Sequence, residues 1–469
     1  METIDRRLAK IVPSQRQFVF QQTEFYAFIH FTVNTFTGKE WGDGKEKPEI
    51  FYPQALNAEQ WVNAVKSAGM KGLILTCKHH DGFCLWPSQY TAHSVAASPY
   101  REGRGDIVQE VAEACRKGRI KFGVYLSPWD RNHPSYGTGQ AYNDYFVNQL
   151  TELLTGYGEV FAVWFDGACG EGANGKRQAY DWNRYYQVIR KLQPNACINV
   201  CGPDIRWCGN EGGNTRESEW SVVPRRARDT EKIAENSQQG DNIEFRCRKM
   251  RASDRDLGSR AMLEGEKELI WYPAEVNTSI RPGWFYHQEE DGQVKSLEEL
   301  FDIYLRSVGG NASFLLNIPP DKNGLIHPND EARLKELGTL IQSAFSHNLL
   351  GQGKAAVDCW KPGHGIQSAF SDSYESWFQT PEHKASCEIT INFPQTTPVT
   401  FVVLKEYILD SQRIERFSIW NEGHELLYRG TTVGYKKIVS LPQKPQVRTL
   451  RICIEDSRVY PTLAFLGIY

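Results

Sequence analysis

The sequence predicts an α/β fold: a (β/α)8-like TIM barrel, regular or incomplete, over residues 1–348, followed by a C-terminal antiparallel β-sandwich over residues 349–469. From Glu24 to about His347, short β-branched apolar runs alternate with amphipathic helical patterns, which is typical of βα units around a parallel sheet. Near Leu349 the pattern changes to short alternating runs separated by turn residues. A length of 469 residues accommodates both units, because an α/β barrel takes about 250 residues.

Seven apolar runs of the first unit are candidates for barrel strands, and the sixth of them is weak. They are Phe25–Val33, Gly72–His79, Ile120–Pro128, Val160–Asp166, Cys197–Val200, Val276–Ile280 and Phe314–Ile318. Helical patterns lie between them at residues 57–69, 106–115, Asn143–Thr155, Tyr180–Leu192, Leu297–Val308 and Asn329–Phe345. An open doubly wound sheet is the competing architecture. It is disfavoured because no G-x-G-x-x-G or G-x-x-x-x-G-K-[ST] motif follows any of these strands.

The second unit contains short runs in which apolar and polar residues alternate, as expected for strands with one buried face. The candidate strands are Ser386–Phe393, Thr400–Lys405, Arg416–Trp420, Lys436–Val439 and Thr449–Ile454. We expect this sandwich of about 120 residues to be an accessory or carbohydrate-binding-like domain.

Composition and charge exclude several classes of function. The chain has 54 Lys and Arg against 57 Asp and Glu, and it contains no long basic run, so we expect neither nucleic acid nor an anionic membrane as a partner. No stretch approaches the roughly 18 apolar residues of a membrane span, and Met1–Lys10 lacks the apolar core of a signal peptide. A chain trimmed of an export signal would be periplasmic or secreted, and otherwise cytoplasmic. The 11 cysteines include no C-x-x-C pair, which favours buried thiols over a zinc or disulfide framework.

The functional residues of a barrel lie at the carboxyl ends of its strands, because the loops that leave those ends form the rim of the active site. The candidate strands of this chain end in polar and aromatic residues where a structural end would need only a turn. We therefore expect one mouth to collect His30, His79, His80, Tyr125, Trp129, Trp164 and Asp166.

Asp166 closes an otherwise apolar run and is followed by Gly167, which permits close approach of a ligand. A turn or helix-capping role explains the pattern equally well. Paired carboxylates would indicate glycoside cleavage, in which one attacks the anomeric carbon and the other protonates the leaving oxygen. The segment after the fifth strand offers Glu211, Glu217 and Glu219, although each of them, taken alone, is typical of a solvated surface acid.

The sequence His79-His80-Asp81 raises the question of a metal site, since imidazole and carboxylate are common ligands. Adjacent strand residues point to opposite faces, which makes a two-histidine chelate awkward unless the strand has already ended. Hydrogen bonding to hydroxyl groups is the favoured role, and we expect no metal and no cofactor. A serine hydrolase is excluded by the absence of a G-x-S-x-G nucleophile elbow.

Five ordered motifs resemble family 29 of the glycoside hydrolases, the retaining α-L-fucosidases. They are Ile29-His30-Phe31-Thr32, Glu40-Trp41, Lys78-His79-His80-Asp81-Gly82-Phe83, Phe122-Gly123-Val124-Tyr125-Leu126-Ser127 and Val163-Trp164-Phe165-Asp166-Gly167. The resemblance covers the barrel and, more loosely, the sandwich. It implies that Asp166 is the nucleophile. The residues that it places around the fucose are His30, Glu40, Trp41, His79, His80, Tyr125, Trp164 and Trp284.

The acid/base residue follows from a second resemblance. Gly209-Asn210-Glu211-Gly212-Gly213 and Arg216-Glu217-Ser218-Glu219-Trp220 are similar to the branch of the family that prefers α-1,3 and α-1,4 fucosyl linkages. This implies Glu211 as the acid/base, with Glu217 as runner-up. The implied activity is hydrolysis of terminal L-fucose from branched, Lewis-type oligosaccharides or glycoconjugates.

Two rival hypotheses belong to other functional classes. One is a carbohydrate-binding protein that has lost turnover, which the retention of Asp166 and a candidate acid disfavours. The other places glycan binding in the C-terminal sandwich, with the barrel as its scaffold.

Overall fold

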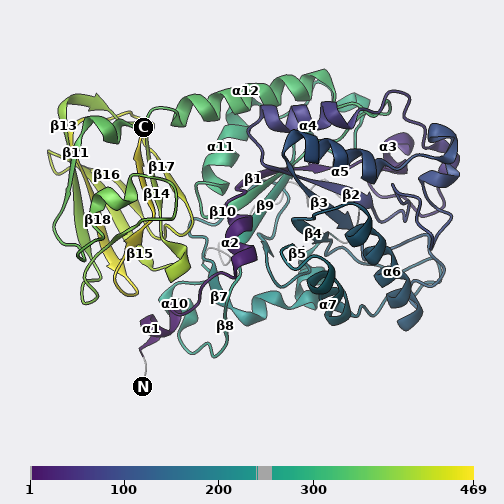
Figure 1. Cartoon of the computed structure of the whole chain (residues 1–469), viewed down its shortest axis with the longest axis horizontal. Helices are drawn as coiled ribbons and strands as arrows, with labels where there is room; N and C mark the ends of the chain where they lie inside the picture. The colour runs from purple at the N-terminus through teal and green to yellow at the C-terminus, as the bar shows by residue number, and fades with distance from the viewer. Residues whose placement is uncertain (1–2, 239, 241–255) are drawn as a thin grey trace.

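The computed structural model describes residues 3–238, 240 and 256–469, and it confirms a parallel eight-stranded, nearly closed barrel followed by antiparallel sheets (Figure 1). The strand order around the barrel is β5-β4-β3-β2-β1-β10-β9-β6. The bounds are β1 Phe25–Ile29, β2 Gly72–Lys78, β3 Lys121–Leu126, β4 Ala162–Phe165, β5 Cys197–Val200, β6 Arg206–Trp207, β9 Ala274–Ser279 and β10 Ala312–Asn317. A single parallel bridge between Asn199 and Ile205 joins the two edges of the sheet.

Helices surround the barrel where the amphipathic patterns predicted them. They are α4 Ala58–Ser67, α5 Ile107–Gly118, α6 Gln140–Gly156, α7 Trp182–Leu192, α11 Leu297–Ser307 and α12 Pro328–Phe345. The Asn57 side chain accepts a hydrogen bond from the backbone N–H of Gln60, so the expected N-cap of α4 is present. Shorter helices also lie in the described chain: α1 Ile4–Leu8, α2 Gln15–Gln21, α3 Val33–Thr37, α8 Thr230–Asn236 and α10 Arg260–Leu263.

Strand β6 is the main departure from the predicted barrel. Only five residues separate it from β5, so the crossover helix that usually joins parallel neighbours is missing at this point. Val200 adopts a positive φ of 66°, and the Asp204 carboxylate accepts a hydrogen bond from the backbone N–H of Ile198 at 2.8 Å, so the chain turns back at once. A two-residue strand carries no periodicity, so β6 could not be predicted from the pattern of apolar residues.

The C-terminal part consists of antiparallel sheets in a sandwich-like arrangement. The five-stranded sheet has the order β11-β13-β18-β15-β16, the three-stranded sheet β17-β14-β20 and the two-stranded sheet β12-β19. Their bounds are β11 Lys354–Val357, β12 Phe378–Gln379, β13 Cys387–Pro398, β14 Phe401–Lys405, β15 Ile414–Asn421, β16 Leu426–Gly430, β17 Lys437–Ser440, β18 Gln446–Ser457, β19 Thr462–Leu463 and β20 Phe465–Ile468. Between the barrel and these sheets lies a small two-stranded antiparallel sheet, β7 Val222–Pro224 with β8 Leu269–Trp271.

Strand β14 joins the C-terminal sheets to the barrel. Its five residues are all buried, because alternate side chains face different cores. Val402 and Leu404 pack in the core between the sheets, whereas Phe401 and Val403 belong to the core of the barrel. The two parts therefore share one continuous apolar interface, which lies beside α11 and α12 in Figure 1.

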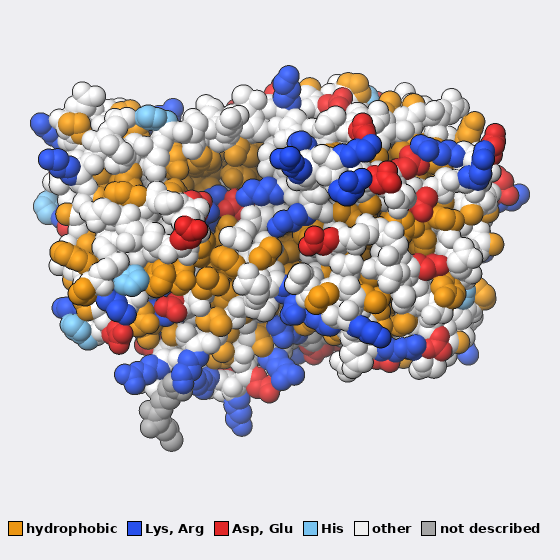
Figure 2. Space-filling model, in the orientation of Figure 1, with side chains coloured by type: hydrophobic (Ala, Val, Ile, Leu, Met, Phe, Trp, Pro, Cys, Tyr) orange, Lys and Arg blue, Asp and Glu red, His pale blue; other side chains and the backbone are white. Residues whose placement is uncertain are grey.

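The surface agrees with the balanced composition. On the face shown in Figure 2, Lys and Arg side chains lie interspersed with Asp and Glu side chains. Within the described ranges, no helix combines the length and the apolar character that crossing a bilayer requires.

Lys78, the last residue of β2, is buried beside the functional end of the barrel. Its Nζ lies 2.9 Å from Asp130 Oδ2 and donates to Gln149 Oε1 at 2.9 Å, and neither charged side chain of the pair is exposed. This ion pair holds the end of β2, from which the chain continues directly into His79.

Replacing Lys78 by alanine leaves the Asp130 carboxylate buried without its cation. We expect Lys78→Ala to lower the free energy of unfolding by about 3–5 kcal/mol, measured by urea denaturation followed by tryptophan fluorescence. Lys117→Ala, which breaks a fully solvated ion pair with Glu59, is the matched control and should change little. Equal urea midpoints for the two variants would contradict this account of the end of β2.

Candidate active site at the carboxyl ends of the barrel strands

A pocket opens at the carboxyl ends of the barrel strands, where the barrel architecture places active sites. It is lined by Phe28, His30, Glu40, Trp41, His79, His80, Trp164, Asp166, Ala168, Glu211, Gln238, Asn277 and Trp284. Nine predicted site residues are in this set. Tyr125 lies directly against it, since its hydroxyl donates to Asp166 Oδ2 at 2.9 Å.

Glu217 has a different position. It is exposed and lies near Tyr428 and Lys437 of the C-terminal sheets, whose pKa values it influences. Glu219 is buried between Arg206 and Arg216. Of the three acids offered by the segment after β5, Glu211 alone lines the pocket.

Asp166 sits just beyond the end of β4. Its Oδ1 accepts from the backbone N–H of Ala168 at 2.8 Å, and its Oδ2 lies 3.7 Å from His80 Nε2. About a fifth of the side chain, 22 %, is exposed toward the pocket. Burial raises the pKa of Asp166, while the hydrogen bonds from Ala168 and Tyr125 act in the opposite direction.

The hydrogen bonds around two histidines fix their tautomers. Ser127 Oγ donates to the carbonyl of Trp129 at 2.6 Å, so His80 Nδ1, 2.7 Å from Ser127 Oγ, must be the donor. Likewise His30 Nδ1 donates to Asn317 Oδ1 at 2.8 Å. Burial lowers the pKa of His30 to about 4 and that of His80 to about 3. Both rings are therefore neutral at pH 7, and each has an Nε2 that can accept a hydrogen bond.

His79 completes a cluster of three imidazoles. Its ring centroid lies 4.1 Å from that of His80 and 5.5 Å from that of His30, and burial lowers its pKa well below the usual value. Among the described residues, its Nδ1 is buried without a hydrogen-bond partner. A buried polar atom of this kind costs free energy unless something in the pocket satisfies it.

The same cluster bears on metal binding. Within the described ranges, His79, His80 and Asp166 can each offer one ligand atom within 4.8 Å of the others. His79 and His80 lie beyond the end of β2 at Lys78, so they do not point to opposite faces of a strand, and both line the pocket. Three such atoms also form a polar wall that can accept hydrogen bonds from hydroxyl groups.

Glu40 holds the loop after β9 against the pocket. Its Oε2 accepts from the backbone N–H of Trp284 at 2.8 Å, and its Oε1 accepts from that of Phe285 at 3.2 Å and lies 2.7 Å from His287 Nε2. Trp284 Nε1 in turn donates to Glu211 Oε2 at 3.0 Å. Glu40 thus lines the pocket and also positions the indole that contacts Glu211.

Beneath the pocket, a buried carboxylate on β9 links several strands. Glu275 Oε1 accepts from Trp164 Nε1 at 2.7 Å, and Oε2 accepts from Asn199 Nδ2 at 2.6 Å and from the Tyr26 hydroxyl. Trp164 stacks on Tyr125 with ring centroids 5.4 Å apart. Glu275 therefore supports the aromatic wall next to Asp166.

Sequence reasoning missed Phe28, Ala168, Gln238 and Asn277. Asn277 could have been found, because Glu275 and Asn277 alternate as inward-facing positions of a weakly apolar strand. Gln238 follows the short helix α8 and had no pattern that pointed to the pocket.

Comparisons with known proteins identify the family. A sequence model of the α-L-fucosidase family matches residues 13–344. The chain belongs to this family. α-L-Fucosidase 1 of Arabidopsis thaliana is 37 % identical to it over 98 % of this chain and 87 % of its own length.

Solved structures agree with the family. A family 29 fucosidase of Ruminococcus gnavus, determined in complex with fucose, matches with a TM-score of 0.85 and 30 % identity over 98 % of this chain and 95 % of its own. A family 29 member from an unknown rumen bacterium matches with a TM-score of 0.79 and 38 % identity over 98 % and 77 %. This chain is accordingly an α-L-fucosidase, a retaining glycoside hydrolase, and its substrates are fucosylated.

Two further cavities of the fucosidase adjoin the pocket. One, of about 280 Å³, shares Glu211 and Trp284 with it and is otherwise lined mainly by polar residues such as Asn214, Lys295 and Arg306. The other shares Asp166 and extends toward α8.

The contact between Glu40 and His287 makes the stability of the fucosidase depend on pH. The hydrogen bond to Glu40 raises the pKa of His287 above its usual 6.5, so the pair adds stability that is complete below about pH 6.5 and is lost as the pH rises through the folded-state pKa. We expect the loss of thermal stability in His287→Gln to be largest near about pH 5.5 and to shrink by about pH 9.

Differential scanning fluorimetry across this pH range is the measurement. His383→Gln, at an exposed site in the C-terminal part, is the control and should show no such trend. A His287→Gln deficit that grows with pH would reverse the sign and refute the assignment.

Proposed function

We propose that this α-L-fucosidase removes terminal α-1,3- or α-1,4-linked L-fucose from branched, Lewis-type glycans. The mechanism is a double displacement in which Asp166 is the nucleophile and Glu211 is the acid/base. The observation that carries the proposal is the meeting of Asp166, Glu211 and three neutral histidines in one pocket. Residues 1–348 form the catalytic unit in this proposal, and residues 349–469 are accessory to it.

Asp166 suits the attacking role because the pocket exposes its carboxylate while the protein fixes both oxygens. Oδ1 is held by the N–H of Ala168 and Oδ2 by the hydroxyl of Tyr125. In the first step an Asp166 oxygen forms a bond to the anomeric carbon as the bond to the leaving oxygen breaks. The product is a covalent glycosyl-enzyme with the leaving group released as an alcohol.

Glu211 supplies the proton that the leaving oxygen needs. It is part of the pocket wall, and the hydrogen bond that Trp284 donates to its Oε2 orients the carboxyl group. After departure of the leaving group, the Glu211 carboxylate takes a proton from water, which attacks the anomeric carbon and frees Asp166. The exposed position of Glu217 supports Glu211 over this runner-up.

The remaining pocket residues fit a 6-deoxy sugar. The neutral rings of His30, His79 and His80 offer nitrogen acceptors for sugar hydroxyls. A sugar hydroxyl would also give His79 Nδ1 a hydrogen bond that the described part of the chain does not supply. Aromatic side chains, among them Phe28, Trp164 and Trp284, provide an apolar surface for the methyl group.

The preference for branched glycans rests on the cavity beside Glu211. The leaving group departs on the side of the acid, and a polar cavity of about 280 Å³ there has room for a further sugar ring. A branched leaving group can fill it, whereas a small aryl group cannot.

The catalytic roles can be separated by substitution. We expect Asp166→Asn to abolish turnover of every fucoside, because no covalent intermediate forms. Glu211→Ala should slow hydrolysis of a Lewis-type trisaccharide by about 10²–10⁴-fold, as loss of a general acid does, and should be rescued by azide on an activated aryl fucoside. Formation of a fucosyl azide of retained configuration is the readout. Azide rescue in Glu217→Ala but not in Glu211→Ala would move the acid/base role.

The linkage preference has its own test. We expect kcat/KM for a Lewis-type trisaccharide to exceed that for a linear α-1,2-linked fucosyl disaccharide by more than about tenfold, equivalent to about 1.4 kcal/mol of transition-state binding. Lys295→Trp, which narrows the cavity beside Glu211, should reduce this ratio but spare a small aryl fucoside. Glu298→Trp, three residues further along in the first turn of α11 and outside the cavity, is the control. Equal use of both linkages by the wild type would defeat the proposal and leave the fucosidase activity intact.

A further inference from the structure

The acid Glu211 lies on an irregular segment, Cys208–Ser221, which we call the Glu211 loop. It joins β6 to β7. Its tip is a compact turn, in which Asn210 Oδ1 accepts from the N–H groups of Gly212 and Asn214, both at 3.1 Å, and Asn210 Nδ2 donates to the Asn214 carbonyl at 3.0 Å. These bonds shape the tip but do not attach it to the barrel.

A buried ion cluster ties the two ends of the Glu211 loop together. Glu219, with no exposed side-chain surface, accepts from Arg206 at 2.9 Å and from Arg216 at 3.1 Å. Arg216 also donates to the carbonyl of Cys208 at 3.1 Å, at the start of the loop. Burial opposes ionisation of Glu219, but the two arginines outweigh it and lower its pKa below the usual range.

The end of the Glu211 loop is held by the C-terminal part of the chain. Gln412, which is fully buried, accepts from the backbone N–H of Ser221 at 2.8 Å, and its Nε2 lies 3.5 Å from the Glu219 carbonyl. Asn311, which directly precedes β10, donates to the same carbonyl at 2.8 Å and accepts from the N–H of Tyr435 at 2.7 Å. The barrel and the C-terminal sheets thus meet on the backbone of residues 219–221.

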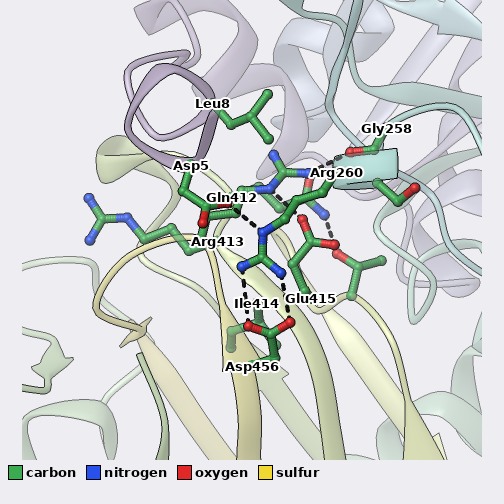
Figure 3. Close-up of polar contacts among 12 residues, drawn as sticks. Asp5, Leu8, Gly258, Arg260, Gln412, Arg413, Ile414, Glu415 and Asp456 are labelled. Carbon is green, nitrogen blue, oxygen red and sulfur yellow. Dashed lines mark hydrogen bonds and ion pairs between the residues drawn. The ribbon is translucent and has the colours of Figure 1, made fainter. Parts of the chain in front are cut away.

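Neighbouring contacts fix the same junction, part of which Figure 3 shows. The guanidinium of Arg458 lies 4.4 Å from the ring centroid of Trp220 in the Glu211 loop, and it donates to the carbonyl of Gly258. Close by, Arg260 of α10 pairs with Asp456 of β18 at 2.7 Å. Arg458, which directly follows β18 and pairs with Glu415 of β15 at 2.7 Å, therefore contacts the Glu211 loop from an ion-paired edge of the five-stranded sheet.

We propose that the C-terminal part of the chain is a positioning element for catalysis, in which Gln412, two residues before β15, fixes the end of the Glu211 loop and so sets the place of the Glu211 carboxyl. The inference rests on the proposed role of Glu211 as acid. Loops away from such anchors sample many positions, and a misplacement of about 1 Å at a reacting group can cost about 10²-fold in rate. The C-terminal part of the chain would thus position the Glu211 carboxyl without contacting the sugar.

The test uses two substrates that differ in their need for an acid. A 2-chloro-4-nitrophenyl fucoside releases a stable phenolate without protonation, whereas a Lewis-type trisaccharide must release a sugar hydroxyl, which needs the proton. We expect Gln412→Leu to lower kcat on the trisaccharide by about 10–100-fold with little change in KM, and to leave kcat on the aryl fucoside within about threefold. Ser418→Ala, which removes a buried donor on β15 without contact to the Glu211 loop, should change neither.

Two outcomes would overturn the inference: an equal loss on both substrates, or no loss on either in a folded Gln412→Leu protein. If that variant does not fold, the exposed pair Ser218 and Thr431 gives a milder break, and Thr431→Val with Ser218→Ala should show the same selective loss at unchanged thermal stability. In a Glu211→Ala background, Gln412→Leu should have no further effect on the trisaccharide, since the group it positions is gone.

The Glu211→Ala variant distinguishes failure of the acid role of Glu211 from failure of the positioning role of Gln412. If it lacks the selective loss on the trisaccharide, the assignment of the acid fails. If it shows the loss and Gln412→Leu does not, only the positioning role fails.

Discussion

The site depends on one buried carboxylate, that of Glu275 at the centre of the barrel. Hydrogen bonds from Tyr26, Trp164 and Asn199 connect β9 through it to β1, β4 and β5. A carboxylate at this depth is tolerable only because neutral donors satisfy both oxygens. The same residue accepts the N–H of Cys208 through its carbonyl at 3.0 Å, where the Glu211 loop begins. Glu275 thus lies under the walls that carry both proposed catalytic carboxylates.

The electrostatics of the pocket follow from the burial of its ionisable side chains. Three imidazoles are crowded together where charge on any of them would be costly, and their pKa values are lowered accordingly. Neutral histidines do not offset the charge of Asp166, whose pKa is raised by burial, while hydrogen bonds to its carboxylate act in the opposite direction. The three neutral rings provide hydrogen-bond acceptors for a neutral, hydroxyl-rich ligand. Asp166, the proposed nucleophile, instead accepts hydrogen bonds that favour its charged form.

Much of this could be read from the sequence, and the exceptions have physical causes. Strand ends such as those before His30, His79 and Asp166 are recognisable because a polar residue follows a buried run. Strand β6 could not be predicted, because a strand of two residues has no periodicity. Gln238 could not be predicted, because a distant loop brings it to the pocket. Glu40 was expected to face the sugar. Its bonds to the backbone of Trp284 and Phe285 come from a loop more than 240 residues away, and no local pattern announces such a contact.

The two-sided burial of β14 has a consequence for how such a protein can change over time. Phe401 and Val403 complete the core of the barrel while Val402 and Leu404 complete that of the sheets. A recombination event that exchanged the C-terminal part for an unrelated module would remove apolar surface that the barrel needs. A lineage that lost the C-terminal part would expose the barrel side of this interface to water, so solubility favours inheritance of the two parts together.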